Sequence, residues 1–148
     1  MFAAHPATDE DLDAVLTMME DFNAIEAIPF DRTVFAPRLR QLAGDRALGG
    51  VLVFTVDGAA AGYAIVTWGW DLEFAGRDAF LTELYVVAAR RGQGVGRQGL
   101  AAAEAFAQAG GAHALHLLVR HDNAAARALY DKSGFATQPR LVMTKRLD

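Results

Sequence analysis

The alternation of apolar and polar residues in the first third of the chain predicts a strand and two helices. Phe2–Pro6 is a short apolar segment that suits an edge strand. Thr8 then precedes a run of acidic residues, as a helix N-cap does, and apolar residues at helical spacing continue a helix to about Phe22. Asp31 can cap a second helix that ends near Gly44.

The pattern changes from helical spacing to strand-like runs near residue 49. Three strands are predicted, at Gly50–Val56, Ala61–Trp70 and Phe80–Val87. Asp57-Gly58 between the first two is a strong signal for a tight hairpin turn. Asp71–Asp78 is a polar connection to the third strand, so this part of the chain predicts an antiparallel meander.

The last third predicts alternating helices and strands. In chain order these are a helix from about Val95 to Ala109 stopped by Gly110-Gly111, a strand at Ala114–Val119, a helix capped by Asp122 or Asn123 that runs to about Lys132 and ends at Gly134, and two final strands at Phe135–Gln138 and Leu141–Arg146.

The element order is therefore βααβββαβαββ, with no internal repeat and no linker. It predicts a single domain over residues 1–148 of the α/β class, with a mixed, mostly antiparallel sheet that helices cover on both faces. The strand–loop–helix–strand segment from Phe80 to Val119 is expected to form its parallel centre through a right-handed crossover.

Composition narrows the functional classes. The 148 residues are 53% hydrophobic, which argues against a disordered chain, and the formal net charge of -4 argues against a general nucleic-acid binder. The absence of cysteine removes disulfides, thiolate nucleophiles and cysteine-based zinc sites. With no signal-peptide pattern and no membrane-spanning apolar run, we expect a cytoplasmic protein that uses neither a membrane nor nucleic acid.

A glycine-rich loop carries the clearest functional signal. Gly92, Gly94 and Gly96 alternate between a predicted strand and the start of a predicted helix, flanked by Arg90, Arg91 and Arg97. Glycines leave the backbone N–H groups accessible, and a helix N-terminus adds unpaired donors and the positive end of its dipole. The sequence therefore predicts a site for a phosphate or pyrophosphate group.

Two common phosphate loops do not match this segment. A Walker A loop requires Gly-Lys-Ser/Thr, which is missing here. The dinucleotide fingerprint belongs to a first βαβ unit, whereas this loop follows three antiparallel-looking strands.

The loop instead resembles the first signature of the GNAT family of N-acetyltransferases. Arg91-x-x-Gly94-x-Gly96 matches the family pattern Gln/Arg-x-x-Gly-x-Gly/Ala, and Leu84–Val87 before it looks like the family's bulged fourth strand. The segment Asn123–Phe135 is similar to the second signature, and the element order also matches. The strand around Glu83 looks closest to small-amine acetyltransferases of the polyamine type.

The resemblance implies acetyl-CoA as cofactor and assigns its contacts. Backbone groups of the loop would hold the pyrophosphate, and the free edge of the fourth strand would pair with the pantetheine arm. The implied cofactor-binding residues are Leu84, Tyr85, Val86, Arg91, Gly92, Gln93, Gly94, Val95, Gly96, Arg97, Asn123, Arg127 and Tyr130. Asn123 could equally be a plain N-cap, and Arg127 a surface charge.

Two residues are candidates for acid–base chemistry. Tyr130 matches the family's tyrosine that protonates the leaving thiolate, although its spacing also suits a core aromatic on an amphipathic helix. Glu83 lies in an otherwise apolar strand where some members place a base, although it could be an outward-facing or ion-paired carboxylate.

The acceptor side is less defined. Acidic and aromatic residues occur together where the family binds its acceptor, at Asp21, Glu26, Asp31, Asp71, Glu73 and Asp78 and at Phe22, Phe30, Trp68, Trp70 and Phe74. Taken singly these are helix caps, turn residues and core aromatics, but as a set they favour a small cationic amine such as a polyamine, diamine or amino sugar. A peptide N-terminus and a non-catalytic acyl-CoA-binding module are the alternatives. A homodimer is expected from the resemblance, and no metal site is expected, because His113 and His116 point to opposite faces of a strand.

Overall fold

Five strands form one sheet in the order β1-β2-β3-β4-β5. The computed structural model describes all residues 1–148, which divide into two compact units at Met1–Leu118 and Val119–Asp148. The sheet lies in the first unit, with strands β1 (Phe2–Pro6), β2 (Gly49–Val56), β3 (Ala59–Asp71), β4 (Gly76–Val86) and β5 (Leu115–Leu117). Its first four strands pair antiparallel and β4 pairs with β5 in parallel, which confirms the predicted mixed sheet. The parallel pair lies at an edge of the sheet and not at its centre, where it was expected.

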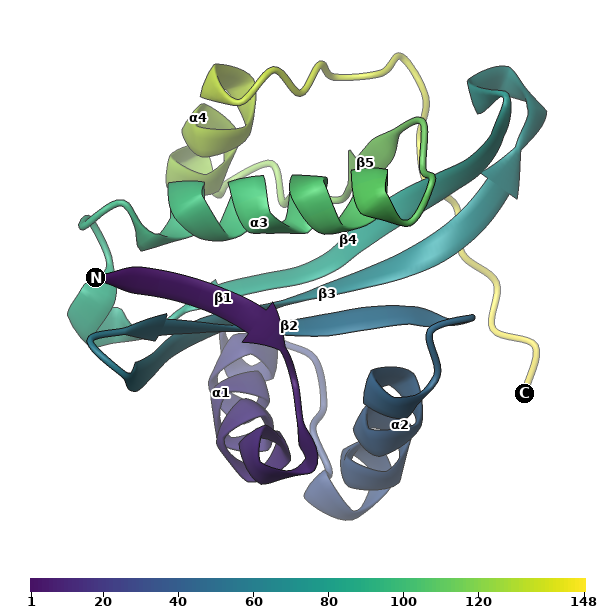
Figure 1. Ribbon diagram of the computed structural model, residues 1–148. Helices are drawn as coiled ribbons and strands as arrows, with labels where there is room; N and C mark the ends of the chain where they lie inside the picture. Colours follow the sequence, from purple (N-terminus) through teal and green to yellow (C-terminus); the bar gives the residue numbers. More distant parts are fainter. The chain divides into compact units, whose positions relative to one another are not determined.

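Helices cover both faces of this sheet. Helices α1 (Leu12–Ile25) and α2 (Arg32–Gly44) lie on one face, and α3 (Val95–Ala109) lies on the other (Figure 1). Short 3-10 turns η1 (Asp9–Asp11), η2 (Leu72–Phe74) and η3 (Ala88–Arg90) precede α1, join β3 to β4, and follow β4. None of the helices has the length and apolarity that a membrane-spanning segment needs.

Successive side chains of each central strand point to opposite faces of the sheet, so they pack into two separate cores. One core lies beneath α1 and α2 and buries, among others, Leu12, Val15, Leu16, Met19, Leu39, Val53, Tyr63 and Ile65. On the other face, Gly99 of α3 approaches the ring of Phe54 so closely that a Cβ at Gly99 would collide with it. This close approach brings the first turns of α3 against the sheet, where the candidate site lies.

Local sequence signals set most element boundaries. Asp57 (φ 52°) and Gly58 (φ 81°) both have left-handed backbone conformations, which confirms the tight turn between β2 and β3. Asp31 caps α2 by accepting a hydrogen bond from the Thr33 N–H at 2.9 Å. Helix α1 continues to Ile25, three residues beyond the expected end.

The prediction of two final strands is wrong. Residues 135–148 form no regular structure, and Leu141, Val142 and Met143 are 87%, 65% and 91% exposed. These residues are consecutive and apolar, so they lack the alternation that would give a strand one buried face. The sheet therefore has five strands, and the fold class is unchanged.

The second unit contains helix α4 (Ala124–Lys132). Asn123 Oδ1 accepts a hydrogen bond from the Ala126 N–H at 3.2 Å, so Asn123 is the N-cap. Gly134 has φ 91° just after the helix, which is the terminator expected there. The rings of Tyr130 and Phe135 meet edge to face at 5.8 Å. A single domain over residues 1–148 stays a prediction.

Candidate active site

The second half of β4 has an unpaired edge. The parallel ladder joins only Ala79, Phe80 and Leu81 of β4 to β5, and it ends at the pair Leu81–Leu117. Strand β4 continues to Val86, still paired with β3 on its other side. Backbone N–H and C=O groups of β4 that lie beyond Leu81 and face the β5 side therefore have no strand partner there.

The register with β3 identifies which backbone groups face this edge. Tyr85 lies opposite Tyr63, and the Val87 N–H donates to Ala61 O at 2.9 Å. Because backbone groups alternate between the two sides of an antiparallel strand, the N–H and C=O of Leu84 and Val86 point away from β3. Those of Tyr85 point towards β3, so only its side chain is available for other contacts.

A bulge in β4 determines where Glu83 points. Ile65 lies opposite Glu83 and Val66 lies opposite Leu81, so Thr82 is the extra residue. Leu81 faces α3, and without this extra residue Glu83 would share its face. The bulge moves the Glu83 side chain to the face that α1 and α2 cover.

The Glu83 carboxyl group is largely buried and held by one tyrosine. The Tyr63 hydroxyl donates a hydrogen bond to Glu83 Oε1 at 2.7 Å. Burial raises the pKa of Glu83, and the hydrogen bond from Tyr63 lowers it by less. A carboxyl group whose pKa is moved towards neutral pH is better matched to proton transfer than a solvated one.

A second tyrosine links the loop after β4 to helix α1. The Tyr85 hydroxyl donates to Asp21 Oδ2 at 3.1 Å, while the Arg91 guanidinium lies 5.6 Å from the centre of the Tyr85 ring. Desolvation raises the pKa of Tyr85, and Asp21 adds to that shift. Arg91 Nε also donates to Val86 O at 2.9 Å, so this side chain lies against the open edge of β4.

The glycine loop presents backbone donors without side chains in the way. Gly92 and Gly94 have φ 75° and 83°, and a Cβ at either position would meet nothing within 4 Å. The first helical hydrogen bond of α3 runs from the Gln98 N–H to Gly94 O. The N–H groups of residues 95–97 are therefore not used within the helix, and they add the positive end of its dipole.

Comparison with known proteins decides the family. The profile described as "Acetyltransferase (GNAT) family" matches residues 15–135. The chain belongs to the GNAT acetyltransferase family. It is therefore an acyltransferase that uses acetyl-CoA, as the sequence signatures implied.

Solved structures share the fold over almost the whole chain. A proposed acetyltransferase from Arthrobacter sp. FB24 is 28% identical, with a TM-score of 0.82 over 98% of this chain and 96% of that one. The aminoglycoside N-acetyltransferase AAC(6')-Iy in complex with CoA is 14% identical, with a TM-score of 0.86 over 100% and 96%. An aminoglycoside acetyltransferase from an uncultured soil metagenomic sample, in complex with sisomicin, is 15% identical, with a TM-score of 0.76 over 98% and 95%. No match is found among curated proteins.

The open edge and the loop together suit the two parts of acetyl-CoA that the GNAT resemblance assigned to them, the pantetheine arm and the pyrophosphate. The strand groups of Leu84 and the Val86 N–H, which face away from β3, can hydrogen-bond the amides of the pantetheine arm, and the N–H groups around Gly94 suit a pyrophosphate. The Gln93 side chain points back to the turn that precedes the loop, where its Nε2 donates a hydrogen bond to Ala89 O at 3.0 Å. The individual contacts to the cofactor stay predictions.

The remaining predicted site residues lie on or beside α4, in the second unit. Besides its cap, Asn123 keeps an amide nitrogen that the cap does not use. Arg127 donates to His121 O at 3.1 Å. The roles of Asn123, Arg127 and Tyr130 towards acetyl-CoA stay predictions.

The acidic and aromatic residues of the acceptor side fall into different groups. Asp31 and Asp71 are helix caps, each accepting a backbone N–H. Trp68 is half-buried and stacks on Phe106 of α3 with ring centres 5.4 Å apart. Asp78, expected to end a polar connection, is instead 4% exposed within β4, because that strand begins at Gly76.

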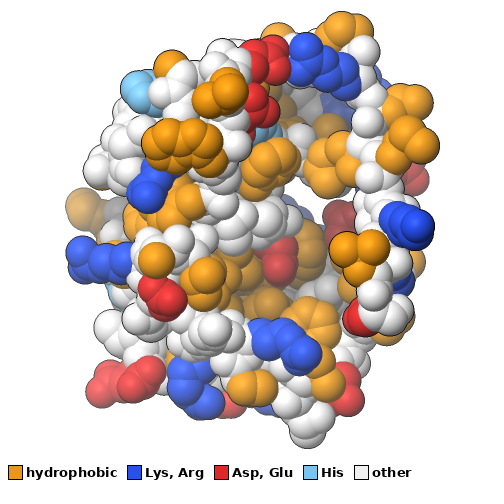
Figure 2. Space-filling model, turned by 90° about the vertical axis from the view of Figure 1, so that its right-hand side faces the viewer, with side chains coloured by type: hydrophobic (Ala, Val, Ile, Leu, Met, Phe, Trp, Pro, Cys, Tyr) orange, Lys and Arg blue, Asp and Glu red, His pale blue; other side chains and the backbone are white.

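The surface carries both signs of charge. On the face shown in Figure 2, basic and acidic side chains are interspersed among hydrophobic ones. This distribution lacks, on that face, the continuous basic stripe that follows a nucleic-acid backbone.

Sequence reasoning missed two residues of this region. Tyr63 supports Glu83 and His116 contacts Asp78, at 2.7 Å and 3.0 Å. Both contacts join residues on neighbouring strands, and they depend on the strand register. A bulge that shifts this register by one residue has no reliable signature in a single sequence, so these pairs could not be read from spacing.

Proposed function

We propose that this GNAT enzyme transfers an acetyl group from acetyl-CoA to the primary amine of a small cationic acceptor, by direct attack in a ternary complex. The observation that carries the proposal is the partly buried Glu83 carboxyl group, which belongs to the segment of β4 with the open edge and which the bulge turns to the face of α1 and α2. Asp21 on α1 adds a second acidic group on the same side of the sheet.

The attacking amine must first lose a proton. An alkylammonium with a pKa of ~10.4 is neutral in only about one molecule in two thousand at pH 7. Glu83 accepts that proton, directly or through water, because its raised pKa keeps it closer to the working pH than a solvated carboxylate. The Tyr63 hydroxyl holds the carboxylate in place while it does so.

Two further roles concern the thioester: stabilising its carbonyl oxygen and protonating the thiolate that leaves. The cofactor supplies an activated acetyl group with a thiolate as leaving group. We assign to the Leu84 N–H, which faces away from β3, a hydrogen bond to the thioester carbonyl as negative charge develops on its oxygen. Tyr130 is assigned the proton for the departing thiolate by the GNAT resemblance.

Release of free thiol from acetyl-CoA tests this function directly. The purified protein has no cysteine, so it contributes no thiol background. The acceptors would be polyamines, diamines, monoamines, aminoglycosides, amino acids and short peptides. Turnover with diamines, polyamines or amino sugars supports the proposal, and turnover with peptides alone would replace it by the N-terminal alternative.

A non-catalytic acyl-CoA-binding module predicts a different result. Acetyl-CoA would raise the melting temperature, yet no acceptor would release thiol. Tyr130→Phe separates the two further: turnover is expected to fall about 10²-fold or more if Tyr130 is the acid. Binding of acetyl-CoA should stay within a few-fold of the unaltered protein.

Aminoglycosides are included in the panel for a specific reason. Two solved structures with the same fold are aminoglycoside acetyltransferases, one of them bound to sisomicin. At 14% and 15% identity they share the fold, and this makes an amino sugar a member of the acceptor class to be tested and nothing more.

A further inference from the structure

A buried carboxylate and a histidine form a pair outside the machinery described so far. Asp78 at the start of β4 is 4% exposed, and its Oδ2 lies 3.0 Å from Nε2 of His116 on β5. Its other oxygen, Oδ1, is buried without a hydrogen-bond partner. Oδ1 fits only because Gly69 lies opposite, where a Cβ would collide with it. Burying a carboxylate with one unpaired oxygen is costly, and a purely structural position would be filled better by an apolar residue.

The pair leaves one imidazole nitrogen for another partner. A carboxylate only accepts hydrogen bonds, so in the neutral ring Nε2 carries the proton towards Asp78 and Nδ1 keeps its lone pair. The His116 side chain is 24% exposed, so a ligand can approach it. Aromatic rings flank it, Phe74 at 4.8 Å and Phe80 at 4.9 Å between ring centres. An accepting nitrogen backed by a negative charge and bordered by rings suits a cationic group.

This cluster shares a sheet face with Glu83. Ala79 and Leu81 are buried on the α3 side, since their β3 partners Trp68 and Val66 lie towards Phe106 of that helix. Asp78 and Phe80 alternate with them and therefore face the other side, and the bulge brings Glu83 to that side too.

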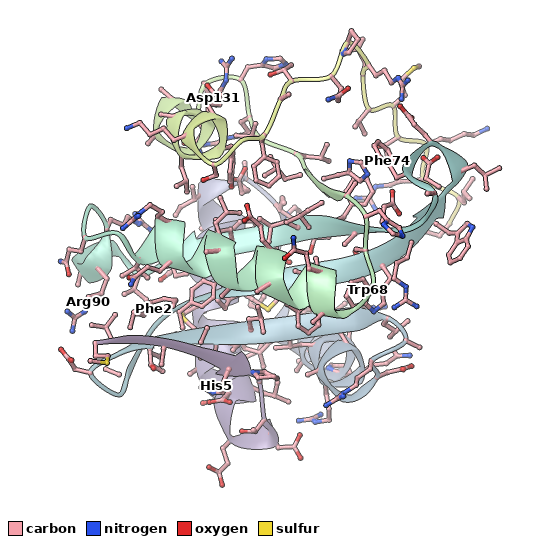
Figure 3. The ribbon with its side chains drawn as sticks, turned by 45° about the horizontal axis from the view of Figure 1, so that its top comes forward. Phe2, His5, Trp68, Phe74, Arg90 and Asp131 are labelled. Carbon is pink, nitrogen blue, oxygen red and sulfur yellow. The ribbon has the colours of Figure 1, made fainter.

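The spacing along β4 sets the length of a ligand that could contact both the Asp78–His116 pair and Glu83. His116 lies opposite Phe80, three positions before Glu83 in the chain. At ~3.3 Å per residue, this separation is about 10 Å. Figure 3 shows Phe74 at the end of the β3–β4 hairpin far from Arg90, which follows β4 on the side of the cofactor loop.

We propose that the Asp78–His116 pair, with Phe74 and Phe80, is an acceptor subsite that binds a second, distal ammonium group about 10 Å from the amine that is acetylated. The inference rests on the proposed function and narrows it to diamines and longer polyamines. His116 and Asp78 are then specificity determinants, and neither touches the reacting atoms.

Kinetics with amines of graded length test the subsite. The substrates are α,ω-diamines of increasing chain length and monoamines of the same lengths, assayed with the unaltered protein, His116→Gln and Asp78→Asn. We expect KM for the long diamines to rise about tenfold in His116→Gln, with kcat within about twofold and with KM for monoamines unchanged. An equal effect on diamines and monoamines would overturn the proposal, because a merely structural pair would affect both alike.

The chain offers a matched control and an independent readout. His5 Nε2 lies 3.0 Å from Asp11 Oδ2, so His5→Gln breaks a similar pair far along the chain from the cluster, and it should leave all KM values unchanged. Titration calorimetry of a long diamine into the protein saturated with CoA measures binding without turnover. Binding weakened about tenfold in His116→Gln supports the subsite even if Asp78→Asn does not fold, and unchanged binding refutes it.

The same experiments separate failure of the subsite from failure of the proposed function. If the unaltered protein acetylates monoamines and diamines without any length preference, the subsite is wrong and the amine acetyltransferase stands. If it acetylates no amine, the proposed function is wrong. In that case the calorimetric comparison still decides whether His116 binds a diamine.

Discussion

The Tyr63 hydroxyl donates a 2.7 Å hydrogen bond to Glu83 Oε1. Glu83 lies immediately after the bulge that shifts the register of β4 against β3 by one residue. Tyr63 is fully buried, and its ring packs against Phe22 of α1 with centres 6.4 Å apart. The proposed base is therefore held in position by the core beneath α1.

Removing that hydroxyl should alter the pH dependence of the enzyme. In Tyr63→Phe the Glu83 carboxylate loses the interaction that lowers its pKa, so its pKa should rise further above the ordinary value. The acidic limb of the kcat/KM profile should therefore move to higher pH. Loss of a hydrogen bond to a charged group also costs roughly 1.5–3 kcal/mol of unfolding free energy. An acidic limb that stays in place would show that Glu83 does not set it.

Glu83→Gln should lower activity and raise stability at the same time. Loss of the base is expected to reduce kcat/KM by about 10²–10⁴-fold. Because the folded-state pKa of Glu83 is raised, its contribution to stability is fully present below the unfolded-state pKa and is lost as pH rises through the folded-state pKa. At pH values above the folded-state pKa of Glu83, the variant should therefore melt at a higher temperature than the unaltered protein. The difference in melting temperature should shrink in acid.

Thermal melts from acid to mildly alkaline pH, with kinetics alongside, check both halves of that expectation. Glu20→Gln on the exposed face of α1 is the matched control, and it should change neither activity nor the pH dependence of melting. A Glu83→Gln protein with full activity would remove Glu83 from the mechanism while leaving the acetyltransferase assignment intact.

Gly94→Ala tests whether the loop holds the cofactor. Its φ of 83° is unfavourable for alanine, so the variant should lose about 1–2 kcal/mol of stability, and the strained loop should bind acetyl-CoA more weakly. Gly111→Ala is matched, because Gly111 has φ 87° and equally open surroundings just after the other end of α3. In calorimetric titrations, the affinity for acetyl-CoA should fall in Gly94→Ala and stay unchanged in Gly111→Ala. Equal affinities in the two variants would contradict the phosphate site.

Substitutions at Asn123 separate its two readings. Asn123→Ala removes the cap of α4 and should cost about 1 kcal/mol, whereas Asn123→Asp keeps a capping oxygen and should be nearly as stable as the unaltered protein. If the amide nitrogen contacts acetyl-CoA, Asn123→Asp should still weaken its binding. If instead the affinity for acetyl-CoA falls only in Asn123→Ala, where the helix is destabilised, Asn123 acts as a cap alone.

The sequence by itself predicted most of the elements and indicated the family. Helical spacing, the Asp57-Gly58 turn and the glycine loop are local signals, because each depends on backbone conformation within a few residues. They were sufficient to predict the mixed sheet, the helices on its two faces and a phosphate site, and the resemblance to the GNAT family then implied acetyl-CoA as cofactor. The last two predicted strands failed for the opposite reason: a strand requires a partner and a buried face, and residues 135–148 have neither.

Only the tertiary structure decided which side chains act together. The pairs Tyr63–Glu83, Tyr85–Asp21 and Asp78–His116 join residues 20, 64 and 38 positions apart in the chain. Each depends on strand register or on helix packing, and the bulge at Thr82 determines which face Glu83 occupies. A shift of one residue moves a strand's side chains to the opposite face, so the same sequence pattern would have placed Glu83 beside α3 had the bulge been absent.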